Sequence, residues 1–255
     1  MGGAPSQILP LAPVDRWKRD PVAPPPGIWL GGADVLDKPD FFYSNQIGWV
    51  LSLGPSGPSQ NIKLAGRKHI RIDDVSGANL GQYFKEIVLF IGEGRHIHGH
   101  NVYIHCQAGI SRSTTSLCAY LMAHLGLRFH ECLQYCILRR RAVCPNEGFR
   151  AQLREYERSK LRGILAESLR KQCAWYDDIR TQDINDIRRG LRQDPCDDVD
   201  QAAGVEAMAT RNAREAVDKA LAAPETTGLR LSRRSVREAI GLSWLINSKS
   251  VEHPN

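Results

Sequence analysis

Residues 102–113 read VYIHCQAGISRS, and most of what the sequence predicts follows from this stretch. Its first four residues are apolar or aromatic and end in a histidine, a pattern that favours a short buried strand. Cys106 then begins a six-residue turn that contains Gly109 and leads into Arg112. Leucines recur every four residues beyond the turn and predict a helix over 111–125. The chain therefore passes directly from a strand through a tight turn into the N-terminus of a helix.

This arrangement is typical of an anion-binding site. Successive backbone N–H groups of such a turn point into one concavity, and the helix N-terminus adds partial positive charge. The turn residues expected to bind a phosphate are Gln107, Ala108, Gly109, Ile110 and Ser111. The same positive potential favours the thiolate form of Cys106, which is the nucleophilic form of cysteine. The planar guanidinium of Arg112 can bind two phosphate oxygens at once, which a lysine cannot do.

Two neighbours of the turn are candidates for supporting roles. Ser113 can donate a hydrogen bond to the sulfur of Cys106 and assist its departure when a thiophosphate intermediate breaks down. His105 directly precedes the nucleophile, and its ring nitrogens can orient the turn through hydrogen bonds. The sequence thus predicts Cys106, Arg112, Ser113 and His105 as parts of one catalytic centre.

The order His-Cys-x5-Arg-Ser in residues 105–113 resembles the signature of the cysteine-based protein phosphatases, and in particular their dual-specificity branch. Segments 28–32, 79–84, 119–122 and 145–149 are similar to the same family, so the resemblance covers about 28–158. It implies a protein tyrosine phosphatase-like fold and hydrolysis of phosphotyrosine, and of phosphoserine or phosphothreonine, through a cysteinyl-phosphate intermediate. It also implies phosphoprotein substrates, with kinases among the candidates, and no cofactor or metal.

The resemblance implies roles for residues outside the turn as well. The family places an aspartic general acid upstream of the cysteine, where Asp74 stands 32 residues before Cys106. Asn146 matches a position that hydrogen-bonds the catalytic turn. Arg141 matches a position that lines a second anionic pocket, although a solvated helix end is an equally good interpretation of the run at 139–141.

Asp73 is the alternative to Asp74 as the general acid. Both follow a short strand expected at 69–72, and adjacent side chains of a strand point to opposite faces. Only one of the two carboxyl groups can therefore face the catalytic turn easily, and we expect it to be that of Asp74.

Apolar patterns on both sides of the turn predict the fold class. Strands are expected at 49–53, 69–72 and 102–105, and helices at 80–94, 111–125, 129–141 and 146–160. This alternation predicts a three-layer α/β protein with a central, mostly parallel sheet flanked by helices.

The same patterns divide the chain into three parts. Residues 1–27 contain seven prolines and are expected to be a disordered lead to a catalytic domain at 28–158. Residues 159–255 are expected to be a C-terminal extension that is helical or partly disordered. Within it, 177–192 and the neighbourhood of 236–245 favour helices, whereas 196–230 is polar, rich in alanine and poorly patterned.

Charge and cysteine content exclude several other classes. The formal charge is +6, and residues 1–159 carry most of it with 18 Lys or Arg against 13 Asp or Glu, which suits an anionic substrate. No dense basic stripe is visible, so nucleic acid is not an expected partner. The seven cysteines form no repeated CxxC pair, and we therefore expect no metal site.

The N-terminus matches a targeting pattern. It reads MGGAPS, which fits the pattern for N-myristoylation of Gly2. One acyl chain supports only weak membrane binding, with modest help here from Arg16, Lys18 and Arg19. A secretory signal and long apolar runs are both absent from the sequence. The expected location is therefore cytoplasmic and partly membrane-associated, without secretion.

Other substrates and a non-enzymatic role remain as alternatives. Phosphoinositides, RNA 5′-triphosphates and glucans are substrates of related enzymes, but lipid phosphatases usually carry lysines in the turn, where Gln107, Ala108 and Ile110 are uncharged. A catalytically inactive phosphate-binding adaptor is the alternative from another class. Such adaptors usually lack the cysteine, and here Cys106 and Arg112 are both present.

Overall fold

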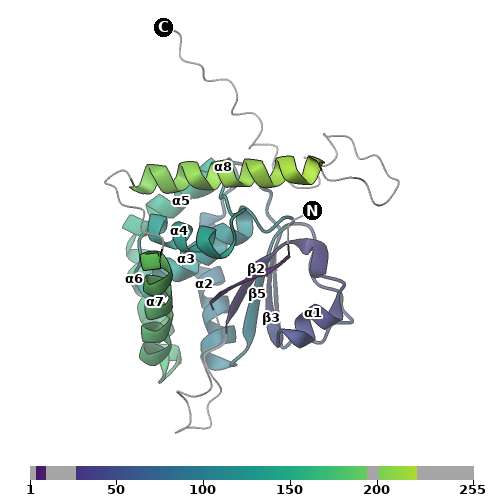
Figure 1. Cartoon of the computed structure of the whole chain (residues 1–255). Coiled ribbons are helices and arrows are strands. Elements are labelled where there is room, and N and C mark those ends of the chain that lie inside the picture. Colours follow the sequence, from purple (N-terminus) through teal and green to yellow (C-terminus); the bar gives the residue numbers. More distant parts are fainter. Residues whose placement is uncertain (1–3, 10–26, 194–200, 223–255) are drawn as a thin grey trace.

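Five strands form one mixed sheet at the centre of the molecule (Figure 1). The computed structural model describes residues 4–9, 27–193 and 201–222. The strands are β1 (Ser6–Leu9), β2 (Ile28–Gly31), β3 (Ile47–Leu53), β4 (Gly66–Ile70) and β5 (Asn101–His105), in the spatial order β1-β2-β5-β3-β4. β1 is antiparallel to β2, and the other pairings in the sheet are parallel. The expected α/β class with a mostly parallel sheet is confirmed.

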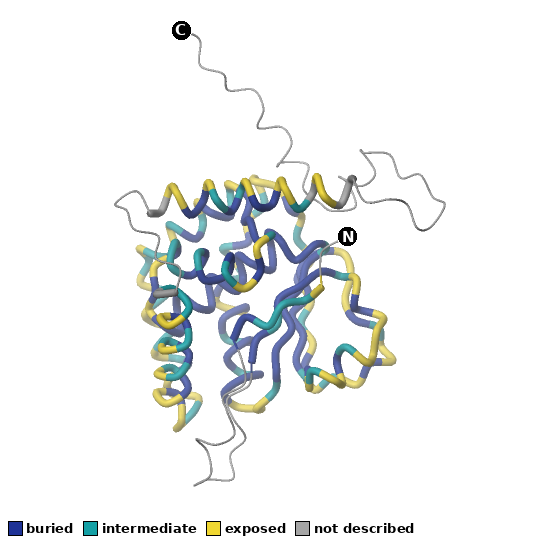
Figure 2. The backbone as a smooth tube through the Cα atoms, viewed as in Figure 1, coloured by how far each residue is buried: buried dark blue, intermediate teal, exposed yellow. Residues whose placement is uncertain are grey.

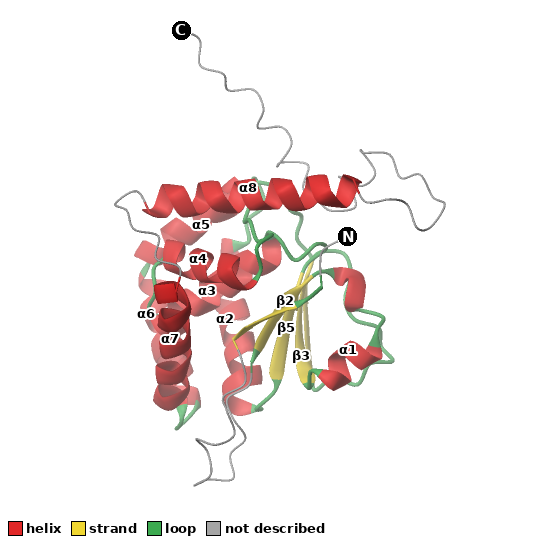
Figure 3. Ribbon diagram, viewed as in Figure 1, coloured by secondary structure: helices red, strands yellow, loops and turns green. Residues whose placement is uncertain are grey.

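Helices cover both faces of this sheet and complete the expected three layers (Figure 3). One face carries η2 (Ala33–Val35) and α1 (Pro39–Ser44), and Phe42 of α1 packs there with Val50 and Tyr103. The other side carries η3 (Gly81–Tyr83), α2 (Phe84–Gly92), the π-helical turn η4 (Glu93–Ile97), α3 (Arg112–Leu125), α4 (Phe129–Arg139) and α5 (Glu147–Arg158). Every residue of α3 is buried, because the sheet and the other helices surround it.

The central position of β5 determines where the catalytic turn lies. All five residues of β5 are buried, since it is paired on both edges and covered on both faces. The turn leaves the carboxyl end of β5, in the middle of the sheet. In α/β sheets this carboxyl edge is where ligands commonly bind.

The expectation of a disordered lead over 1–27 is wrong for its first part. Ser6–Leu9 form β1, with Ile8 and Leu9 fully buried against the edge of β2. The hydroxyl of Tyr135 in α4 also donates to the carbonyl of Ile8 at 2.9 Å. Two adjacent apolar residues thus extend the sheet, a signal that the surrounding prolines masked. Residues 10–26 of the expected lead lie outside the described residues.

The C-terminal extension packs as helices on the catalytic half. α6 (Lys160–Gln172), α7 (Tyr176–Gln193) and α8 (Gln201–Ala222) follow α5, and α7 matches the helix expected at 177–192. Leu165, Leu169 and residues of α7 and α8 belong to the same hydrophobic core as α3. The extension is therefore not a separate body among the described residues. The helix expected near 236–245 lies outside them.

Helix α8 shows that Gln201–Ala222, the described part of the range 196–230 interpreted as poorly patterned, is helical. Its buried apolar residues are Val205, Ala209 and Ala213, spaced four apart on the side that faces the domain (Figure 2). Alanine carries so little apolar surface that a helical stripe of alanines gives a weak hydrophobic signal. None of the described helices has the length and apolar character needed to span a membrane.

Candidate active site

Hydrogen bonds from outside the turn fix the backbone between β5 and α3. The carbonyl of Gln107 accepts from the backbone N–H of Ala33 at 3.0 Å, and that of Ile110 accepts from the N–H of Cys144 at 2.8 Å. The carbonyls of Ala108 and Gly109 accept from the guanidinium of Arg140 at 3.2 and 2.9 Å. Because these carbonyls point outward, the peptide N–H groups between them are directed to the centre of the turn. The expected anion-binding concavity thus has a physical basis.

Two glycines permit this geometry. Gly109 has φ of +68°, and a Cβ there would lie 2.3 Å from the carbonyl carbon of Gly31 at the end of β2. Gly54 follows β3 with φ of +122°, and a Cβ there would lie 2.5 Å from Nη1 of Arg112. L side chains rarely adopt such backbone angles. Gly54 directly follows the strand expected at 49–53 and was not predicted to belong to the site.

Cys106 lies at the base of the turn, with 2% of its surface exposed. Its Sγ is 3.3 Å from the hydroxyl oxygen of Ser113 in the first turn of α3, as the expected hydrogen bond to sulfur requires. The Nε2 atom of His105 is 2.7 Å from the hydroxyl oxygen of Ser52 on β3. Burial lowers the pKa of His105 to about 4, so its ring is neutral at pH 7. His105 thus ties the end of β5 to β3.

Asp74 is the carboxylate that faces the turn. It is buried, whereas Asp73 is exposed, so the two side chains do point in different directions. The Oδ1 atom of Asp74 accepts from the hydroxyl of Ser111 at 2.7 Å and from the side-chain amide of Asn146 at 2.9 Å. Burial raises the pKa of Asp74, and Arg112, Ser111 and Asn146 oppose that effect only in part. A raised pKa keeps a larger fraction of this carboxyl protonated, as a general acid requires.

Arg112 joins the acid to the turn. Its Nε lies 3.4 Å from Oδ2 of Asp74, and its Nη1 donates to the carbonyl of Ile72 at 3.0 Å. The side chain is 5% exposed, so its orientation is fixed before any substrate arrives. The structure therefore brings Cys106, Arg112, Ser113, Asp74 and Asn146 together around residues 107–111.

Comparison with known proteins places this site in a family. The family model described as "Dual specificity phosphatase, catalytic domain" matches residues 28–159. The chain belongs to the dual-specificity phosphatase family. It is therefore a cysteine-dependent protein phosphatase.

Similar proteins cover much of the chain. Dual specificity protein phosphatase 15 of Rattus norvegicus is 34% identical over 84% of this chain and 85% of its own length. The crystal structure of DUSP15 superposes with a TM-score of 0.53 at 32% identity, over 58% of this chain and 92% of that one. MAP kinase phosphatase with leucine-rich repeats protein 1 of Dictyostelium discoideum is 47% identical over 35% of this chain, which is 10% of its own length.

Arg140, and not Arg141, contacts the catalytic turn of this phosphatase. Arg141 extends into solvent with 73% of its side chain exposed and pairs with Glu215 of α8 at 2.9 Å. Two interpretations of Arg141 were left open by the sequence. Its exposure fits a solvated helix end better than the lining of a second anionic pocket. Arg140 is buried and follows Cys132 and Cys136 at helical spacing, and this spacing is the signal that could have identified it.

Two further expectations concern residues away from the turn. Within the described ranges, no group of three or more His, Cys, Asp or Glu residues could hold a metal ion. Gly2, the expected site of myristoylation, lies outside the described residues, so lipidation stays a prediction.

Proposed function

We propose that this phosphatase hydrolyses phosphotyrosine, phosphoserine and phosphothreonine in proteins, with Cys106 as the nucleophile and Asp74 as the general acid. The thiolate sulfur of Cys106 attacks phosphorus, and the bond from phosphorus to the side-chain oxygen of the substrate breaks. Asp74 gives its proton to that departing oxygen. The observation that supports this assignment is the convergence of Cys106, Arg112 and Asp74 on one turn with inward backbone amides.

The other residues of the site serve the same two steps. The backbone amides of 107–111 and the guanidinium of Arg112 stabilise the equatorial oxygens as charge develops on them. In the second step Asp74 accepts a proton from water, whose oxygen attacks the phosphocysteine while the sulfur departs. The hydroxyl of Ser113 donates a hydrogen bond to that sulfur, which departs as a thiolate. Asn146 and Ser111 hold the Asp74 carboxyl in place through their hydrogen bonds.

Kinases are the substrate class that we propose within the phosphoproteins. The support is the name of a similar protein, a MAP kinase phosphatase, together with the basic excess of residues 1–159. An activated kinase presents its phosphates on an exposed loop, which suits a site at the carboxyl ends of the sheet strands. We further propose a cytoplasmic location with weak membrane association through Gly2.

A substrate panel tests this proposal. Phosphotyrosine, phosphoserine and phosphothreonine peptides are compared with a phosphoinositide, an RNA 5′-triphosphate and a phosphoglucan, all in the presence of a chelator. We expect release of phosphate from the peptides and little from the other three. Cys106→Ser provides the matched blank, since it keeps the turn and Arg112. Turnover of the peptides by that variant, or preference for a non-peptide substrate, would contradict the proposal.

A further inference from the structure

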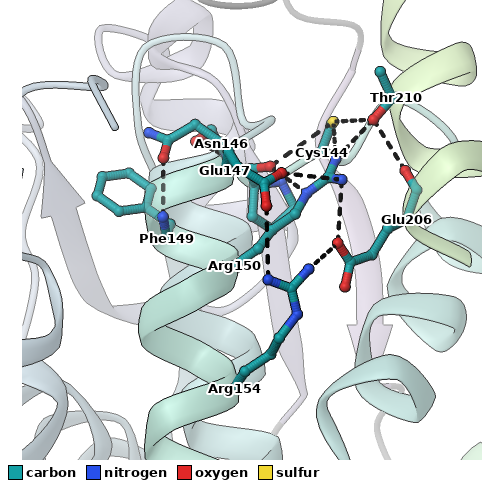
Figure 4. A network of polar contacts seen from close by, with 10 residues as sticks. Cys144, Asn146, Glu147, Phe149, Arg150, Arg154, Glu206 and Thr210 are labelled. Carbon is teal, nitrogen blue, oxygen red and sulfur yellow. Dashed lines mark hydrogen bonds and ion pairs between the residues drawn. The ribbon is translucent and has the colours of Figure 1, made fainter. Parts of the chain in front are cut away.

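Helix α8 contacts the enzyme through a buried ion pair with α5 (Figure 4). Arg150 of α5 is 5% exposed, and its Nη1 lies 3.4 Å from Oε2 of Glu206 on α8. Its Nη2 donates to the hydroxyl oxygen of Thr210 at 2.8 Å, and that hydroxyl donates to the carbonyl of Glu206. Glu206 also pairs with Arg154, one turn further along α5. Two residues of α8 therefore hold one buried guanidinium from the same side.

Besides a 4.0 Å pairing with the exposed Glu147 in its own helix, Arg150 contacts the segment that precedes α5. Its Nε donates to the carbonyl of Pro145 at 2.8 Å, and its Nη2 lies 3.0 Å from Sγ of Cys144. The backbone N–H of Arg150 also donates to the carbonyl of Asn146 at 2.9 Å. A planar guanidinium with this many fixed partners allows little movement of the segment 144–146.

That segment in turn holds the catalytic turn and the general acid. The N–H of Cys144 donates to the carbonyl of Ile110, and the N–H of Asn146 donates to the hydroxyl oxygen of Ser111 at 3.1 Å. The side-chain amide of Asn146 donates to Asp74 at 2.9 Å. A continuous set of contacts thus runs from α8 through Arg150 and the segment 144–146 to the carboxyl group of Asp74.

We propose that Arg150 is a positioning residue for the general acid and that Glu206 and Thr210 of α8 hold it in its working position. Helix α8 is then part of the catalytic unit, although the family's catalytic domain ends at residue 159 of this chain. The proposal rests on the role of Asp74 proposed above. It assigns to the C-terminal extension a contribution to proton transfer rather than to folding alone.

A second ion pair between α8 and the domain supplies a matched control. Arg141 and Glu215 lie 2.9 Å apart, but their side chains are 73% and 55% exposed. Exposed pairs of this kind contribute little to stability, and this one has no contact with the segment 144–146 among the described residues. Glu215→Gln therefore removes one carboxylate from the same helix without touching the contacts of Arg150.

The test is the ratio of two activities in the full chain. The first is kcat/KM on a phosphotyrosine peptide, whose leaving oxygen needs a proton. The second is kcat/KM on p-nitrophenyl phosphate, whose leaving group departs without one. A variant that merely unfolds in part loses both activities in the same proportion, so its ratio stays constant. Misplacement of Asp74 lowers only the first activity strongly, and the ratio falls.

We expect Glu206→Gln combined with Thr210→Val to lower this ratio about fivefold, within the range of measured couplings between remote sites. Glu206→Gln alone should lower it less, and Glu215→Gln should leave it unchanged. An unchanged ratio in the double variant would overturn the proposal, as would an equal fall with Glu215→Gln.

Asp74→Asn distinguishes an error in the positioning role of Arg150 and α8 from an error in the general-acid role of Asp74. It should lower the ratio further than any α8 variant. If it does so and the α8 double variant does not, only the positioning role of Arg150 and α8 is wrong. If Asp74→Asn itself leaves the ratio unchanged, Asp74 is not the general acid, and the positioning proposal is overturned with it.

Discussion

The carboxyl group of Asp74 experiences opposing influences. Burial raises its pKa, while Arg112, Ser111 and Asn146 favour the charged form and reduce the rise. The net pKa is above the ordinary value. The acid therefore stays protonated to a higher pH than an exposed aspartate would, and the alkaline limb of the pH profile for kcat/KM should reflect its deprotonation.

Substitution of the two adjacent aspartates tests this assignment. Asp74→Asn should abolish the alkaline limb for a phosphopeptide substrate and reduce kcat/KM by about 10²–10⁴, the usual contribution of a general acid. Asp73→Asn is the control, because Asp73 is exposed and points away from the turn. If the two variants exchange these phenotypes in steady-state pH profiles, the acid is Asp73.

Among single residues, the sequence predicted those site residues that belong to a local sequence pattern. Cys106, Arg112 and Ser113 lie within one short motif. The burial of Asp74 and exposure of Asp73 agree with the expectation that only Asp74 faces the turn, although β4 ends at Ile70, before both aspartates. Gly54 and Arg140 were not predicted, since their importance comes from contacts with residues far away in the chain. The register of the arginines at 139–141 depends on where α4 ends, and sequence patterns locate helix ends poorly.

Elements at the margins of the family domain differ most from expectation. β1 and α8 both lie outside 28–159, yet both contribute fully buried residues to the core. Their sequence signals are weak for physical reasons. β1 has only two strongly apolar residues between prolines, and the buried stripe of α8 consists largely of alanine. The strands and helices of the central part have longer apolar patterns and were predicted close to their observed bounds, except that the strand expected at 69–72 lies at Gly66–Ile70.

The contribution of β1 can be measured by removing apolar surface from it. Ile8→Ala should lower the free energy of unfolding by about 2–5 kcal/mol, because Ile8 is fully buried and the substitution removes buried apolar surface and leaves a cavity. Ile164→Ala in α6 is the control, since Ile164 is 60% exposed and should change the value by less than about 0.5 kcal/mol. Urea unfolding of both variants would settle the comparison. Equal, small effects would mean that β1 adds nothing to the core.

At the scale of the whole molecule, a second buried polar cluster joins η4, α3 and α7. Arg95 pairs with Asp183 at 2.8 Å, and Asp183 also lies 2.9 Å from Nε2 of His124. The hydroxyl of Tyr120 lies 3.0 Å from Nε2 of His96. Burial lowers the pKa of both histidines. This cluster fixes α7 to the domain, and the lowered pKa values of its two histidines favour their neutral form.

Stability should therefore fall as the pH decreases from about 7 to about 5. The unfolded chain takes up protons on its histidines below about pH 6.5, whereas the lowered pKa values of His105, His96 and His124 make the folded chain take up fewer. His105, with its pKa of about 4, alone accounts for about 2 kcal/mol over this interval. The raised pKa of Asp74 acts in the opposite direction.

Urea titrations at the two pH values would measure this effect. Asp74→Asn is the control, because removal of the opposing carboxyl should make the decline steeper. In Asp74→Asn, where that opposing carboxyl is gone, a free energy of unfolding equal or higher at pH 5 would contradict the lowered pKa values of these histidines.

The most direct test of the central claim is to trap the intermediate on Cys106. The full-length enzyme is mixed with a phosphotyrosine peptide, quenched in acid within the first turnover and digested for mass spectrometry. We expect phosphate on the fragment that contains Cys106, and none on that fragment from Cys106→Ser treated in the same way. Phosphate on another residue, or full turnover without any phosphocysteine, would contradict the mechanism.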